Sequence, residues 1–186
     1  MDILVESLFN AMHDQLKRSS SMLAFVQARV SAESFVRNEC ALAVFNSLDG
    51  AKYHVHMEKK YEGKTVDLLI HKVEDGIQRK EPVLQFELKM AWHGGWLQNA
   101  AGVNHDLDAL QGRENAWSLV LFFAFEKANK GFPYQPTGIS FEDGLRQFVG
   151  KVNAGPPTWK SPVFDMSFGD SVGKACLMAW PATTQS

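Results

Sequence analysis

The sequence predicts an α/β fold in which a central mixed β-sheet is flanked by helices. Three observations support this class. Apolar residues repeat at helical spacing early in the chain, three strand-like segments with short connections follow, and residues 117–125 then form an uninterrupted apolar run. Short connections favour an antiparallel meander, and a helix before the apolar run permits a right-handed parallel crossover. The run itself is typical of a central strand covered on both faces.

The helices are predicted from apolar spacing and from capping residues. Apolar residues three and four positions apart indicate a first helix over residues 2–18 and a short second helix over residues 22–30. Ser31 is a suitable N-cap for a third helix, which Asp49 and Gly50 end. Two later helices are expected over residues 97–110 and 141–149.

The strands are predicted from apolar and β-branched runs bounded by turn sequences. Glu62-Gly63 and Glu74-Asp75-Gly76 are such turns, and a Pro- and Gly-rich stretch over residues 155–162 is expected to be irregular. The expected strands cover residues 52–61, 65–70, 83–90, 117–125 and 175–180.

Composition indicates a single ordinary globular domain over residues 1–186, with 45% apolar and 22% charged residues. The net charge of −2 gives no global attraction to polyanions, so any nucleic-acid contact would need a local patch. Cys40 and Cys176 lie in apolar contexts and are expected in the core. The N-terminus lacks the pattern of a signal peptide, and no apolar run approaches the ~20 residues that span a bilayer, so a cytoplasmic location is expected.

Two of the predicted strands carry ionisable residues inside apolar sequence. Asp67 lies between Val66 and Leu68, and Glu87 and Lys89 lie two positions apart on the next strand. Because side chains alternate along a strand, Glu87 and Lys89 share a face, and Asp67 can join them if the strands pair. Two carboxylates and an ammonium group suit a divalent metal ion and a water molecule to be activated. The alternative is a salt bridge without catalysis.

A further carboxylate is expected at this site from the third helix. Glu39 shares its helix face with apolar residues that should pack on the sheet, so it needs a compensating partner such as a metal ion or Lys89. Glu33 is the rival, but near the helix start an acidic residue merely complements the helix dipole. We therefore prefer Glu39. The alternative is that Glu39 lies at the edge of the apolar stripe and pairs with an arginine.

The order helix, three strands, helix, strand, with Asp67 on the second strand and Glu87-Leu88-Lys89 on the third, resembles the PD-(D/E)XK nuclease superfamily. The resemblance covers residues 31–125 and implies a restriction-endonuclease-like core with N-terminal helical and C-terminal extensions. One departure is Val66, which stands where the motif has proline.

The resemblance also assigns roles to the motif residues. It implies that Asp67 and Glu87 bind the metal ion and that Lys89 positions the nucleophile. Glu39 matches the helix glutamate that many members add to the site, and Asp106 matches an aspartate that a group of similar proteins carries in the next helix. The backbone carbonyl of Leu88 can supply a further metal ligand. The implied cofactor is Mg²⁺ or Mn²⁺.

The implied function is metal-dependent hydrolysis of phosphodiester bonds in DNA. The alternative is a non-catalytic binding or scaffold subunit that retains the nuclease fold. Cleavage of both strands with one site per chain would favour a homodimer, and the first helix is a candidate interface unless it packs on the sheet.

Basic residues gather around the two predicted hairpins and form a candidate surface for DNA. They are Lys52, Lys59, Lys60, Lys64, Arg79 and Lys80. Such a cluster can follow a phosphate backbone, or it can be the solvated rim that protects an edge strand.

Overall fold

The computed structural model describes residues 2–21, 32–130 and 134–182, and it confirms the α/β class. A seven-stranded mixed sheet has the order β1-β2-β3-β4-β7-β5, and β6 also pairs with β7. Only β3 and β4 are parallel, and every other pair is antiparallel. The strands are β1 (Tyr53–Tyr61), β2 (Lys64–Glu74), β3 (Ile77–Trp92), β4 (Ala116–Lys127), β5 (Trp159–Lys160), β6 (Phe164–Phe168) and β7 (Ser171–Pro181).

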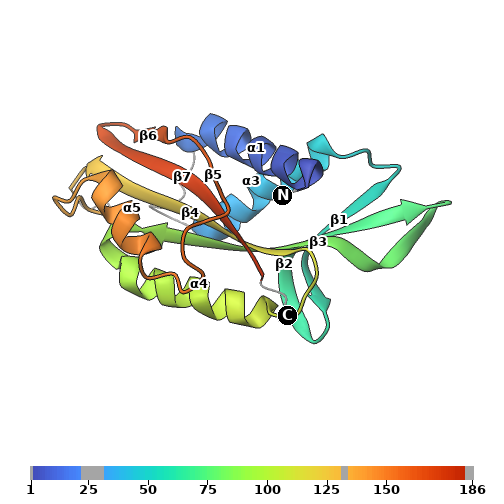
Figure 1. The fold of residues 1–186 in the computed structure, drawn as a ribbon. Coiled ribbons are helices and arrows are strands. Elements are labelled where there is room, and N and C mark those ends of the chain that lie inside the picture. Colours follow the sequence, from blue (N-terminus) through green and yellow to red (C-terminus); the bar gives the residue numbers. More distant parts are fainter. Residues whose placement is uncertain (1, 22–31, 131–133, 183–186) are drawn as a thin grey trace.

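Helices cover both faces of this sheet (Figure 1). The α-helices are α1 (Ile3–Arg18), α3 (Ala32–Ser47), α4 (Trp96–Leu110) and α5 (Phe141–Val149), and a short 3₁₀ turn, His93–Gly95, precedes α4. α1 and α3 lie on one face, and α4 and α5 lie on the other (Figure 1). Among the helices of the described ranges, none is long and apolar enough to cross a membrane.

The predicted central strand is confirmed by the burial of β4. Leu119 and Leu121 belong to the hydrophobic cluster beneath α1 and α3. The intervening Val120 and Phe122 belong to a second cluster beneath α4 and α5. Because its side chains alternate between two covered faces, β4 needs apolar residues at every position.

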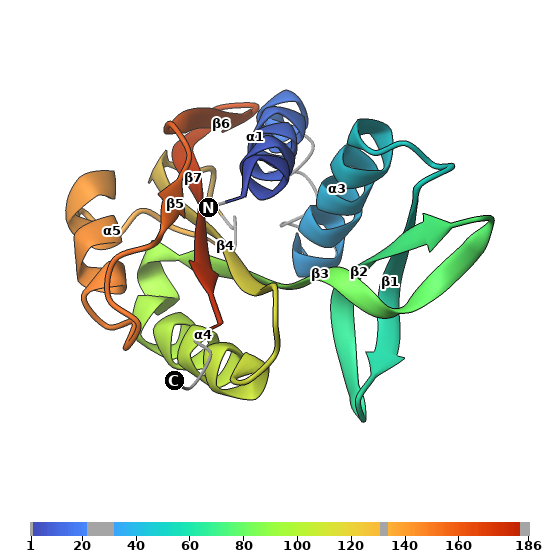
Figure 2. The ribbon, with the colours of Figure 1, turned by 45° about the vertical axis from the view of Figure 1, so that its right-hand side comes forward.

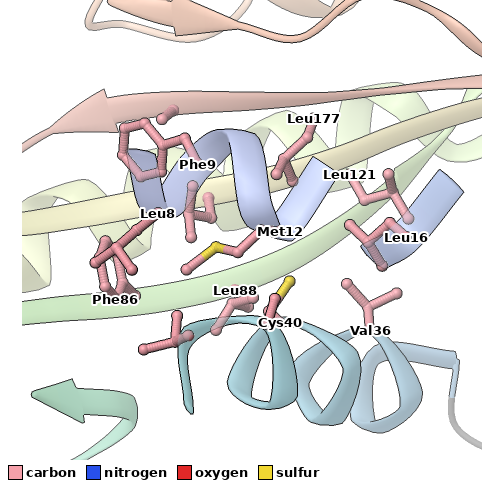
Figure 3. Close-up of a cluster of buried hydrophobic side chains, with 14 of the residues drawn as sticks. Leu8, Phe9, Met12, Leu16, Val36, Cys40, Phe86, Leu88, Leu121 and Leu177 are labelled. Carbon is pink, nitrogen blue, oxygen red and sulfur yellow. The ribbon is translucent and has the colours of Figure 1, made fainter. Parts of the chain in front are cut away.

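α1 packs on the sheet, which is the alternative to its use as a dimer interface. Leu8, Met12 and Leu16 are fully buried and meet Leu88 of β3 and Cys40 of α3 in one cluster (Figure 3). The apolar face of the helix is therefore covered by its own chain. Cys40 and Cys176 are both buried free thiols, which confirms that they are core residues.

The helix and strand boundaries agree with the prediction to within a few residues, with two exceptions. β3 begins at Ile77, well before the predicted start, because a register shift opposite His71 accommodates Pro82, which has no N–H for the ladder. The short strands β5 and β6 were not expected. The predicted helix over residues 22–30 lies outside the described residues.

The sheet is strongly distorted at the end that carries β1, β2 and β3. The turn between β1 and β2 and the turn between β2 and β3 project in different directions from the body of the molecule (Figures 1 and 2). The paired register of β2 and β3 reaches only to Leu68, which lies opposite Phe86. The two strands part beyond that pair, and this parting positions the candidate site.

Candidate functional site

The candidate site forms where β2 separates from β3. Asp67 directly precedes Leu68, the first residue of β2 that pairs with β3, and its Oδ2 accepts a hydrogen bond from the backbone N–H of Leu88 at 2.8 Å. A carboxylate oxygen thus replaces a backbone partner of the ladder, which keeps a buried N–H satisfied. The arrangement brings the side chain of Asp67 to Glu87, and the two carboxyl groups share a hydrogen bond.

Glu87 carries the strongest electrostatic perturbation at the site. Burial, followed by the charges of Asp67 and Asp106, raises the pKa of Glu87 from 4.5 to about 8, although Lys89 acts in the opposite sense. Desolvation and nearby like charges both disfavour an ionised carboxylate. Glu87 therefore retains a proton near neutral pH in the absence of a cation, and its hydrogen bond with Asp67 holds that proton between two carboxyl groups.

Lys89 is held by the helix that follows its strand. Its Nζ lies 3.3 Å from Oδ2 of Asp106 in α4. Burial lowers the pKa of Lys89, but the charges of Asp106 and Glu33 outweigh that effect, so the net pKa is raised. Burial also raises the pKa of Asp106, and Lys89 offsets part of that rise. Lys89 is consequently a positioned ammonium ion, and Asp106 supports it as the resemblance implies.

Arg37 of α3 joins the site through an ion pair that sequence reasoning missed. Its Nε lies 3.0 Å from Oδ1 of Asp67, and its guanidinium also pairs with Glu58 and, at 3.7 Å, with Glu33. The side chain of Arg37 is only 12% exposed, and its buried Nε has no hydrogen-bond partner among the described residues. Arg37 therefore compensates Asp67 by charge rather than by hydrogen bonding.

Glu58 reaches this ion pair because it lies opposite Asp67 in the register of β1 and β2. Met57 pairs with Leu68 and Lys59 pairs with Val66 in the same register, so Glu58 stands directly opposite Asp67. Its φ of 48° lies in the left-handed region. Glutamate has no special preference for that conformation, so the sequence contains no signal for it.

The structure does not bring Glu39 to the site. Its Oε2 accepts hydrogen bonds from Nε2 of Gln15 and Oγ of Ser19, both at 2.6 Å, and these donors lie on and just after α1. At 3.6 residues per turn, Arg37 and Glu39 project roughly 160° apart, so Glu39 faces α1 when Arg37 faces Asp67. The helix carboxylate whose charge reaches Lys89 is Glu33, the rival in the sequence prediction.

The predicted basic surface divides into two groups. Three of its members already make an ion pair or a hydrogen bond. Lys52 lies 3.4 Å from Asp49, Lys64 donates to the carbonyl of Ala109 at 3.3 Å, and Arg79 pairs with Glu74. The other three line one hollow on the distorted end of the sheet and are Lys59, Lys60 and Lys80. A role in binding DNA stays a prediction for all six.

The donor set at the site suits a hard divalent cation with few protein ligands. Within residues 2–21, 32–130 and 134–182, no group of three His, Cys, Asp or Glu side chains is arranged to hold a metal ion. Mg²⁺ is commonly held by only one or two carboxylates and keeps several waters. Asp67 and Glu87 can supply those carboxylates. The residues present therefore fit Mg²⁺ or Mn²⁺, but not a cage built from protein ligands alone.

The chain matches no family model, no curated protein and no solved structure. The function of this protein is consequently inferred from its own geometry. The central observation is that Asp67, Glu87 and Lys89 meet where two strands part.

Gly102 offers a test of the packing between α4 and Lys89. A Cβ at Gly102 would lie 3.7 Å from Cε of Lys89, which is an ordinary van der Waals distance. Because alanine is favoured over glycine in a helix interior, Gly102→Ala is expected to stabilise the fold by about 0.5–1 kcal/mol in urea denaturation. A destabilised variant would show that α4 packs more closely on β3 than described.

Proposed function

We propose that this protein is a metal-dependent nuclease that hydrolyses phosphodiester bonds in DNA. The observation that carries the proposal is the convergence of Asp67, Glu87 and Lys89 at the parting of β2 and β3. The chain order α3, β1, β2, β3, α4, β4 and the parallel pairing of β3 with β4 support a restriction-endonuclease-like core over residues 31–125.

The proposed metal ligands are Asp67, Glu87 and the backbone carbonyl of Leu88. The N–H and C=O of one strand residue point toward the same neighbour, and the N–H of Leu88 points to Asp67. Its carbonyl is therefore directed to the side on which Asp67 lies. When bound, Mg²⁺ or Mn²⁺ supplies Lewis-acid stabilisation of a phosphoryl group and lowers the pKa of a water.

The remaining residues orient charge around the substrate. The ammonium group of Lys89 stabilises negative charge on a phosphoryl oxygen and orients the attacking water. Asp106 fixes the position of that ammonium group, and Arg37 fixes the carboxylate of Asp67. A cation held by Asp67 and Glu87 would compete with the proton of Glu87, so its binding would become tighter as the pH rises.

The proposed setting is a cytoplasmic protein that acts on DNA. One site per chain cleaves one strand, so double-strand cleavage would use a twofold homodimer. The interface of such a dimer lies elsewhere than the apolar face of α1, which is buried against the sheet.

A non-catalytic binding subunit is the second candidate, and one observation favours it. Asp67 is already paired with Arg37, and Lys89 is already paired with Asp106, so both charges are compensated without a metal ion. Buried charges that compensate one another can be purely structural. This candidate predicts that the protein binds no Mn²⁺ and that assembly with a partner survives Asp67→Ala.

The experiment that separates the two candidates combines calorimetry with cleavage assays. Mn²⁺ is titrated into wild type and Asp67→Ala, and each protein is then incubated with single-stranded, duplex and branched DNA. We expect Asp67→Ala to lose metal binding and cleavage, and Lys89→Ala to keep metal binding while losing about 10²–10³-fold in rate. The matched control is Lys127→Ala at the exposed end of β4, which should cleave like wild type.

Wild type that neither binds Mn²⁺ nor cleaves any of the three DNA forms would overturn the nuclease proposal. Cleavage that survives Asp67→Ala would place the activity elsewhere on the chain, or in a contaminant.

A further inference from the structure

Three histidines of β1 and β2 gather on the face of the sheet that also carries Asp67. Asp67, Leu69 and His71 are alternate residues of β2, so their side chains share one face. His71 lies opposite His54 of β1. The imidazole of His56 stands 5.3 Å from that of His71 and 6.4 Å from that of His54, measured between ring centroids. This histidine cluster lies on the distorted end of the sheet, beside the candidate site.

His71 is the buried member of the cluster, and one of its nitrogen atoms has no partner. The residue is 3% exposed, and Nδ1 lies 3.0 Å from the carbonyl oxygen of Arg79, so Nδ1 carries the hydrogen and donates it. Nε2 is buried without a hydrogen-bond partner in the described part of the chain. A buried polar atom without a hydrogen-bond partner destabilises the fold, so it marks a position that a ligand can stabilise.

The other two histidines are already satisfied. Nδ1 of His54 and Nε2 of His56 lie 3.0 Å and 2.9 Å from Oε1 of Gln78, which can accept a hydrogen bond from each ring. Among the residues that the structure places, no three ligating side chains are arranged to hold a metal ion. The cluster is therefore not built as a metal centre, and the open position belongs to His71.

His71 lines a hollow of about 420 Å³ whose rim carries unpaired cations. Lys59, Lys60 and Lys80 line the same hollow and are exposed, and none makes an ion pair within residues 2–21, 32–130 and 134–182. Glu62 and Glu81 also line it, and Glu81 accepts a hydrogen bond from the hydroxyl of Tyr61 at 2.5 Å. The lysines exceed the carboxylates by one, and His71 can add a further charge.

We propose that this hollow is a phosphate subsite that holds the backbone of a nucleic-acid strand at a distance from the cleaved bond. Lys59, Lys60 and Lys80 donate to phosphate oxygens, and His71, protonated on binding, adds a further positive charge to the lining of the hollow. This inference rests on the proposed nuclease function, because that function places the scissile phosphate at Asp67.

The spacing along β2 sets the distance between the two positions. Asp67 and His71 are four residues apart on one strand, which is about 13 Å at ~3.3 Å per residue. A stacked nucleic-acid strand advances ~3.4 Å per nucleotide along the helix axis, so the subsite lies three or four stacked nucleotides from the scissile phosphate. Oligonucleotides shorter than about four nucleotides should therefore gain little from the hollow.

Protonation of His71 makes the subsite sensitive to pH. Burial lowers the pKa of His71, and the charges of His56 and Lys59 from β1 lower it further, whereas the Arg79 carbonyl and Glu81 of β3 act in the opposite sense. A bound phosphate raises that pKa, so binding takes up a proton. Affinity for a long strand should therefore increase as the pH falls from 8 to 6.

The test measures binding without cleavage, in EDTA. Fluorescence anisotropy is recorded for labelled single-stranded DNA of two and of eight nucleotides, with inorganic phosphate as competitor. The triple variant Lys59→Gln, Lys60→Gln, Lys80→Gln is compared with a triple variant of three other exposed lysines, namely Lys17→Gln, Lys127→Gln, Lys130→Gln. Both triples remove the same charge, so only the location differs.

We expect the hollow triple to bind the eight-nucleotide strand at least tenfold more weakly than the control triple. The slope of log K against log[salt] should fall by about 2, at ~0.7 for each phosphate contact on a single strand. Neither triple should alter binding of the dinucleotide. His71→Gln should abolish the gain in affinity between pH 8 and pH 6.

Two outcomes would overturn the subsite. Equal affinity of the two triples for the eight-nucleotide strand would do so, and so would wild type that binds no strand in EDTA. The proposed function can fail separately. If wild type binds the long strand through the hollow but never cleaves it with Mn²⁺, the subsite stands and the nuclease proposal is wrong. Competition by phosphate alone, without any preference for the longer strand, would assign the hollow to free phosphate and overturn its role in binding a strand.

Discussion

Glu87→Gln is expected to abolish DNA cleavage and, at the same time, to stabilise the fold above neutral pH. Glutamine is a poor ligand for Mg²⁺, so cleavage is lost. The pKa of Glu87 is raised from 4.5 to about 8, chiefly by burial, so the ionised form is disfavoured in the fold. The unfolded chain releases this proton near pH 4.5 and the fold near pH 8, so wild type loses stability as the pH rises between those values.

The gain in stability should appear only on the alkaline side. Below pH 4.5 both side chains are neutral, and wild type and Glu87→Gln should unfold at similar urea concentrations. At pH 8.5 the variant should be more stable by an amount on the order of 2 kcal/mol, a figure reduced for the solvent screening of a partly exposed group. Urea denaturation without metal at both pH values measures the difference.

The matched control is Glu39→Gln, the same substitution on the helix glutamate that was predicted from the sequence to join the site. Glu39 accepts its hydrogen bonds from Gln15 and Ser19, and glutamine can accept the same bonds. We expect this variant to cleave DNA at the wild-type rate. Loss of cleavage in Glu39→Gln, together with activity in Glu87→Gln, would reverse the two assignments.

The strand residues of the site could be predicted because strand geometry is nearly invariant. Glu87 and Lys89 must share a face, and a lone Asp67 on the neighbouring strand must approach one edge of that face. The central position of β4 followed from the same rule, because only a strand covered on both faces is apolar at every position. These inferences depend almost entirely on the alternation of side chains between the two faces of a strand.

The helix carboxylate could not be predicted because a helix can be covered from two directions. α3 contacts α1 as well as the sheet, so its apolar residues do not mark the sheet-facing side alone. Leu42 and Phe45, which an apolar stripe would bury, are 45% and 66% exposed. The face of α3 that meets the site instead carries Glu33 and Arg37. Because these residues are charged, a search for an apolar stripe does not identify this face.

Arg37→Met is expected to destabilise the protein by about 3 kcal/mol in the absence of metal. Methionine keeps much of the volume of the arginine stem but leaves the carboxylate of Asp67, which is 15% exposed, without its cation. Removal of one partner of a buried ion pair costs several kcal/mol because the other charge remains buried. Glu58 and Glu33 are 62% and 37% exposed, so solvent screens their share of the loss. Urea denaturation in EDTA measures the effect.

The matched control is Arg146→Met, because Arg146 is 80% exposed and its pairing with Asp143 on α5 should contribute less than about 0.5 kcal/mol. Adding Asp67→Asn to Arg37→Met should restore much of the lost stability, since no uncompensated charge then remains. Mn²⁺ should stabilise Arg37→Met more than wild type, because a cation at Asp67 can replace the missing guanidinium. If Mn²⁺ left the variant unchanged while Asp67→Asn rescued it, Arg37 would be the only cation that Asp67 binds, and the charges at this parting of the strands would be structural.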